Sequence, residues 1–70
     1  MSMALKIRTI LLERKMTVKE LGERIGTTGN NMSTKLNRDR FTEQELKKIA
    51  EVLDCDYDGI FTMRDSGKTI

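Results

Sequence analysis

Apolar side chains recur at helical spacing in four stretches of the chain, and short polar segments separate these stretches. The spacing predicts helices over residues 4–14, 18–25 and 28–37, and a fourth helix that begins after Thr42. In the fourth helix, Leu46, Ile49, Ala50 and Leu53 lie at positions i, i+3, i+4 and i+7, the pattern of one buried helix face. The chain is therefore predicted to be all-α, a bundle of four to five helices.

Two of the predicted helix starts carry a capping box, in which a Thr side chain and a Glu side chain three residues later bond each other's backbone amides. The boxes are Thr17 with Glu20 and Thr42 with Glu45. A hydrophobic staple, a pair of apolar side chains that pack across the start of the helix, frames each box: Met16 with Leu21, and Phe41 with Leu46. These signals are local, so they predict where the helices begin without reference to the rest of the chain.

The pattern changes after Asp54. Residues 57–63 are aromatic and β-branched, Asp65-Ser66-Gly67 is a turn signal, and residues 68–70 can return as a second strand. A lone two-stranded hairpin is marginally stable in water. We therefore expect a short C-terminal β-hairpin that packs on the helices or pairs with another chain.

The composition excludes several functions. The chain has 70 residues, one cysteine and no histidine, so it has no zinc-finger ligand set and no catalytic histidine, and it is too short for a deep substrate cleft. We expect no enzyme activity, no metal, no cofactor and no small-molecule ligand. Cys55 is expected to be a buried structural thiol. An unpaired cysteine, and apolar runs too short for a signal peptide or a membrane span, predict a cytoplasmic protein with no membrane partner.

Charge is distributed unevenly along the chain. Residues 1–40 hold nine Lys or Arg and four acids, a net +5, whereas residues 41–70 hold four Lys or Arg and seven acids, a net −3. The total of +2 hides this division. A basic half joined to an acidic half indicates one face for a polyanion and another face for a different partner.

Residues 17–37 hold the most informative pattern. The turn Gly26-Thr27 is so short that it forces the second helix steeply across the first, and Gly22 leaves space where the two axes approach. Opposite Met32 and Leu36, the helix over 28–37 presents amides and hydroxyls and no carboxylate. Such side chains are mediocre helix formers, but they bond base edges and phosphates. The residues therefore predict a DNA-reading face.

Residues 5–61 resemble the phage-repressor-like (Cro-type) helix-turn-helix domains of the xenobiotic-response-element family of bacterial regulators. The resemblance rests on the segment from Met16 to Thr28, Met32, Leu36-Asn37, Leu46, Ile49-Ala50 and Leu53. It implies a fold of four or five helices whose third helix enters the major groove of double-stranded DNA. Some very short members, from bacterial mobile elements, also end in a hairpin, which implies a homodimer formed through C-terminal residues. Two contacts between the copies stay open from the sequence: pairing of the hairpin across two chains, or the surface of the fourth helix.

The resemblance also implies roles for particular residues. By position, the base-contacting residues are Thr28, Gly29, Asn30 and Thr34, with Asn31 and Ser33 as secondary candidates. The phosphate-contacting residues are Thr17, Lys19, Lys35, Asn37, Arg38 and Arg40. Arg38 stands where the family usually has a glycine, which adds a cation near the backbone of the duplex.

Together, these observations predict a sequence-specific transcriptional regulator, a repressor that acts by occupying its operator. Residues 1–56 would form the DNA-binding part of the single domain, and residues 57–70 its hairpin and dimerisation tail. An interaction module, such as an antitoxin or an adaptor whose acidic half binds another protein, is the alternative that the charge distribution leaves open.

Overall fold

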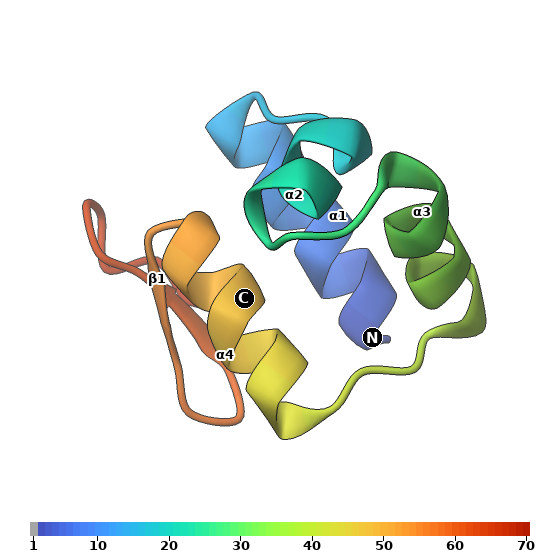
Figure 1. Cartoon of the computed structure of the whole chain (residues 1–70). Coiled ribbons are helices and arrows are strands. Elements are labelled where there is room, and N and C mark those ends of the chain that lie inside the picture. The colour runs from blue at the N-terminus through green and yellow to red at the C-terminus, as the bar shows by residue number, and fades with distance from the viewer. Residues whose placement is uncertain (1) are drawn as a thin grey trace.

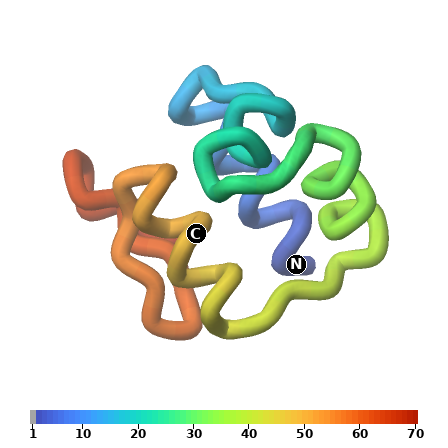
Figure 2. The backbone as a smooth tube through the Cα atoms, viewed as in Figure 1, coloured from blue at the N-terminus to red at the C-terminus, as the bar shows by residue number. Residues whose placement is uncertain are grey.

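Four helices and a C-terminal pair of short strands follow one another along the chain (Figure 1). The computed structural model describes residues 2–70. The elements are α1 (Met3–Arg14), α2 (Val18–Arg24), α3 (Gly29–Arg38), α4 (Glu43–Val52), β1 (Cys55–Tyr57) and β2 (Phe61–Met63). The backbone trace shows α2 and α3 meeting at a short turn, α4 next to α2, and the hairpin beyond α4 (Figure 2). The expected helical fold with a C-terminal hairpin is confirmed, with four helices in the part described.

Local capping determines where the helices begin, as predicted. Both capping boxes are formed: Thr17 and Thr42 each accept from the amide three residues later, and Glu20 and Glu45 each accept from the amide of their own cap residue. Thr28 caps α3 in the same way through its side chain. The observed starts lie within one residue of the predicted ones because these bonds depend only on neighbouring residues.

A single apolar core joins all four helices to the hairpin. Its fully buried large side chains are Phe61, Ile7, Ile10, Leu21, Met32, Ile49, Leu53 and Cys55. The predicted burial of Cys55 is therefore confirmed, and burial raises the pKa of its thiol. Between residues 2 and 70 no polar or charged residue is buried. Burial of the apolar faces therefore holds the fold together.

The hairpin differs from its prediction. The expected single strand over 57–63 is wrong, because a turn at Asp58–Ile60 divides it, with Gly59 at φ +78°. β1 and β2 pair antiparallel with Cys55 opposite Met63. The predicted return of residues 68–70 is confirmed, since Thr69 bridges to Thr62 and the Ile70 amide donates to the Phe61 carbonyl at 2.9 Å. Three short segments thus pack on the helices instead of two.

Arg14 joins the end of α1 to the end of α4. Its guanidinium donates to the carbonyls of Leu53 and Asp54 at 2.9 and 3.1 Å and to the Asp65 carboxylate at 2.8 Å. This guanidinium holds the pKa of Asp65 below its usual range. The two backbone carbonyls that directly follow α4 thereby gain side-chain donors.

None of the helices over residues 2–70 combines the length and the apolar character that a membrane crossing needs.

Candidate nucleic-acid interface

α2 and α3 approach each other through glycine backbone. A Cβ built on Gly22 would lie 2.6 Å from the carbonyl oxygen of Thr28 and 2.8 Å from its carbonyl carbon. A Cβ on Gly29 would lie 3.1 Å from the Cα of Lys19. The space predicted at Gly22 is therefore real, and the first turn of α3 rests directly on α2.

Five of the predicted contact residues meet in one hollow beside this crossing. The hollow has a volume of about 340 Å³ and is lined by Lys19, Thr28, Gly29, Asn30 and Ser33. Lys19 reaches it from α2 and the others from the start of α3. Because Gly29 has no side chain and its backbone lies against Lys19, it can offer only backbone atoms to a ligand. The hollow thus combines a cation with amide and hydroxyl groups.

The polar side chains of α3 differ in how much hydrogen-bonding capacity remains free. The Thr28 hydroxyl accepts from the Asn31 amide, and the Asn31 side chain donates to the Thr27 hydroxyl, both at 3.1 Å. The Thr34 hydroxyl donates to the Asn30 carbonyl at 3.0 Å, which leaves its oxygen free to accept. The exposed Asn30 side chain has no hydrogen-bond partner among the residues described. The donors and the acceptor of the Asn30 side chain are therefore all free for a ligand.

The far end of α3 is held by α1. The Asp39 carboxylate accepts from the Ala4 amide at 2.7 Å, and the Arg8 guanidinium donates to the Asn37 side chain at 3.3 Å. Arg38 and Arg40, on either side of Asp39, are exposed. Sequence reasoning missed Arg8, because nothing near it in the chain signals a contact 29 residues away. This end of α3 therefore presents several cations around a fixed loop.

Acidic groups close to α3 are already engaged. Glu45 pairs with Lys35, which lowers the pKa of that carboxyl together with the bond from the Thr42 amide. Glu20 is occupied by the capping box of Thr17. A phosphate that binds Lys35 would have to displace Glu45 from it. The Thr17 hydroxyl already accepts from the Glu20 amide as the cap of α2. Lys19, Arg38 and Arg40 carry no such commitment between residues 2 and 70.

The family model of the Cro/C1-type HTH DNA-binding domain matches residues 6–66. The chain belongs to this family. The match includes α2 and α3, which form the helix-turn-helix, and continues through α4 and both strands. No curated protein and no solved structure matched the chain.

As a member of this family, the chain is a DNA-binding domain of the kind found in transcriptional regulators, as the sequence predicted. Its α3 has ten residues, and hence a length of about 15 Å at 1.5 Å per residue. The major groove, about 12 Å wide, admits such a helix. In this domain, the hollow lies at the start of α3, and the exposed cations Arg38 and Arg40 lie at its end.

Proposed function

We propose that the chain is a repressor that binds double-stranded DNA sequence-specifically and places α3 in the major groove. The base-contacting residues are Thr28, Gly29, Asn30, Asn31, Ser33 and Thr34, of which Gly29 can also donate its backbone amide to a phosphate. The phosphate-contacting side chains are those of Thr17, Lys19, Lys35, Asn37, Arg38 and Arg40. The observation that carries the proposal is the exposed polar face of α3, which has no carboxylate from Thr28 to Arg38 and has exposed cations at both ends.

Direct reading falls chiefly on Asn30 and Thr34. An asparagine amide bonds adenine bidentately through its two edge groups, and a threonine hydroxyl bonds a base while its methyl contacts a thymine methyl. Backbone amides at the start of α3 add donors for phosphate, because the first amides of a helix have no partner inside the helix. Gly29 contributes in this way, through its backbone alone.

Repression follows from occupancy. A protein bound where polymerase must bind excludes it without any further chemistry. Two copies bound to half-sites about 34–36 Å apart give the usual symmetric arrangement for this motif. We assign the contact between copies to residues 57–70, where Ile60 remains 47% exposed.

The test compares alanine variants that differ in the kind of contact they remove. Asn30→Ala with Thr34→Ala should weaken binding to the preferred duplex by about 1–3 kcal/mol per lost base contact and should relax the preference at those positions. Lys19→Ala should weaken binding to all duplexes alike and should reduce the dependence on salt by about one counterion. Lys15→Ala, an exposed cation outside the proposed contacts, is the matched control.

Binding would be measured by fluorescence anisotropy over a series of salt concentrations. If the double alanine variant keeps the wild-type preference, α3 does not read the bases. If binding is insensitive to salt, phosphate contacts are absent and the proposal fails. A protein that functions as an adaptor would keep its partner when Asn30 and Thr34 are replaced.

A further inference from the structure

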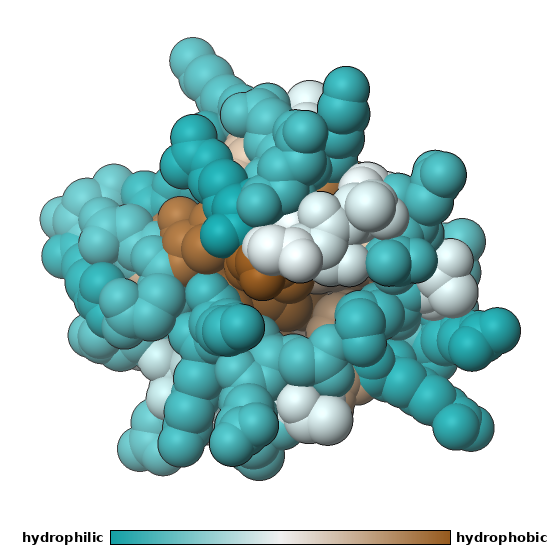
Figure 3. Space-filling model, viewed as in Figure 1, coloured by the Kyte–Doolittle hydropathy of each residue, from teal (hydrophilic) through white to brown (hydrophobic). Residues whose placement is uncertain are grey.

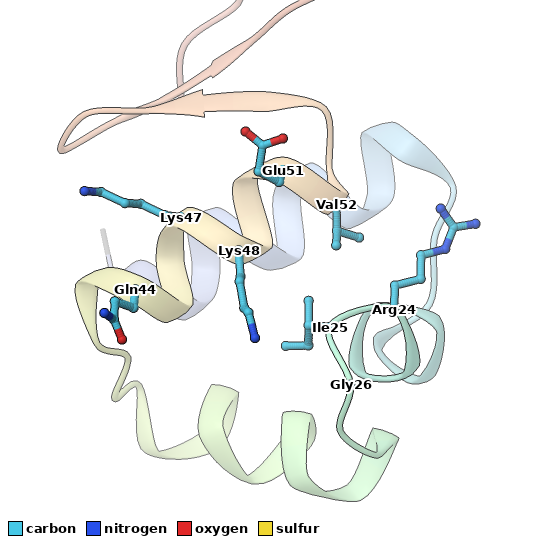
Figure 4. Close-up of a pocket in the computed structure, with 8 residues that line it drawn as sticks. All are labelled: Arg24, Ile25, Gly26, Gln44, Lys47, Lys48, Glu51 and Val52. Carbon is cyan, nitrogen blue, oxygen red and sulfur yellow. The ribbon is translucent and has the colours of Figure 1, made fainter.

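A second surface lies between the C-terminal end of α2 and the outer face of α4. It is an open groove of about 700 Å³, and its floor includes Ile25, the residue that follows α2, and Val52 from α4 (Figure 4). Both side chains are only half-buried. The space-filling view shows apolar surface at the centre of this face, surrounded by hydrophilic side chains (Figure 3). The groove thus leaves apolar area open to water.

The rim of this groove is positively charged. Arg24, Lys47 and Lys48 are exposed, and none of them forms an ion pair within residues 2–70. Lys48 extends from α4 beside Ile25, while Lys47 and Arg24 point outward on either side (Figure 4). The one acid of the rim, Glu51, is held by Arg64 at 2.9 Å. An apolar floor with free cations around it suits an apolar side chain flanked by carboxylates.

The groove is separate from the proposed DNA contacts. None of the residues that line it belongs to the proposed base-contacting or phosphate-contacting set. A DNA backbone would offer charge to the rim but would leave the apolar floor uncovered. The groove therefore fits a protein segment better than nucleic acid.

The turn between β1 and β2 carries the matching chemistry. Ile60 exposes 47% of its surface, and Asp58 beside it is exposed and has no ion pair in the described chain. Behind the turn, Arg64 pairs with three carboxylates, those of Glu51, Asp54 and Asp56, and these acids outnumber it. The turn thus offers an apolar side chain, Ile60, for the apolar floor of the groove and a negative charge, Asp58, for its positive rim.

We propose that the groove receives the β1–β2 turn of a second copy of the chain. Within one copy, α4 separates the groove from the hairpin, as the close-up shows (Figure 4). Each copy offers one groove and one turn, so a two-fold pair forms the contact twice. The inference rests on the proposed function, in which residues 57–70 join two copies of the repressor, and it names the groove as the surface that these residues contact on the other copy.

Charge reversal in the full chain tests this pairing without DNA. Lys48→Glu in the groove and Asp58→Lys in the turn should each lower the dimer association constant by about tenfold or more, because like charges would then face each other. An equal mixture of the two variants should dimerise like the wild type. In the mixed pair, the reversed turn meets the reversed groove, and the unaltered turn meets the unaltered groove. Lys15→Glu, which makes the same charge change outside the groove, should have no effect.

Sedimentation velocity over a range of concentrations gives the association constants. Restored dimer in the mixture supports the inference. A wild-type chain that stays monomeric, a mixture no better than its components, or a dimer abolished by Leu12→Ser on the exposed face of α1 but unaffected by Lys48→Glu would each overturn it. DNA binding measured on the same proteins separates the two proposals, because a monomer that still prefers one duplex leaves the proposed function intact.

Discussion

Replacement of Gly22 by alanine tests whether the close crossing of α2 and α3 determines the stability of the helix-turn-helix. In a helix interior free of clashes, alanine is about 1 kcal/mol more favourable than glycine. Here the added Cβ would lie 2.6 and 2.8 Å from the carbonyl atoms of Thr28. These are backbone atoms at the cap of α3, so they cannot rotate away as a flexible side chain would.

Overpacking of this kind costs about 1–3 kcal/mol. The gain of about 1 kcal/mol in helix propensity offsets part of this cost, so we expect Gly22→Ala to lower the free energy of unfolding by a net amount of up to about 2 kcal/mol, against the direction that helix propensity alone gives. For a domain of this size each kcal/mol lowers Tm by about 4–8 °C. At temperatures below Tm, where the variant is folded, its DNA affinity should also be lower than that of the wild type, because the first turn of α3 must move away from Lys19.

Urea unfolding followed by circular dichroism measures the effect, with an unchanged m value as the check that the two states remain comparable. The sign of the change decides the outcome. If Gly22→Ala is more stable than the wild type by about 1 kcal/mol, propensity dominates and the crossing is looser than the distances indicate.

Three further predictions follow from the structure. Thr42→Ala should lower the free energy of unfolding by about 1 kcal/mol, measured by urea titration, because the Glu45 amide loses its cap. Lys35→Gln should raise the pKa of Glu45 toward its usual value of 4.5, measured by NMR titration, with Lys47→Gln as the control. Because the folded-state pKa of Glu45 is depressed, the stabilisation from its pair with Lys35 is present above the unfolded pKa and disappears as the pH falls through the folded one. Cys55 should react with iodoacetamide only when urea opens the fold, measured by mass spectrometry, because the thiol is buried and its pKa is raised.

Each of these expectations has a clear contrary result. Wild-type stability in Thr42→Ala would show that the cap contributes nothing. If the pKa of Glu45 is the same in Lys35→Gln as in the wild type, the ion pair with Lys35 is not the cause of its lowered pKa. Rapid alkylation of Cys55 in the folded protein would show that the core is open at the start of β1.

Local signals account for what the sequence could predict. The capping boxes at Thr17 and Thr42 and the glycine of the α2–α3 crossing depend on residues close together in the chain, so pattern alone located them. The turn at Asp58-Gly59 was missed although its signal was present, since Asp-Gly is a strong hairpin pair. It lay inside an aromatic and β-branched run that favoured a single strand.

Long-range contacts account for what the sequence could not predict. The bonds of Arg14 to Leu53 and Asp54 span 39 and 40 residues, and the bond between Asp39 and Ala4 spans 35. No periodicity encodes which distant backbone group a side chain will reach. The groove between α2 and α4 was missed for the same reason, because each helix alone shows only ordinary apolar and basic residues.

Selection of duplexes from a random pool by the wild-type chain at physiological salt shows whether α3 reads DNA sequence. We expect enrichment of one palindromic sequence whose half-sites are centred about 34–36 Å apart, one turn of the double helix. A pool that remains random after repeated selection, although the protein is folded, would contradict the claim that α3 reads DNA sequence.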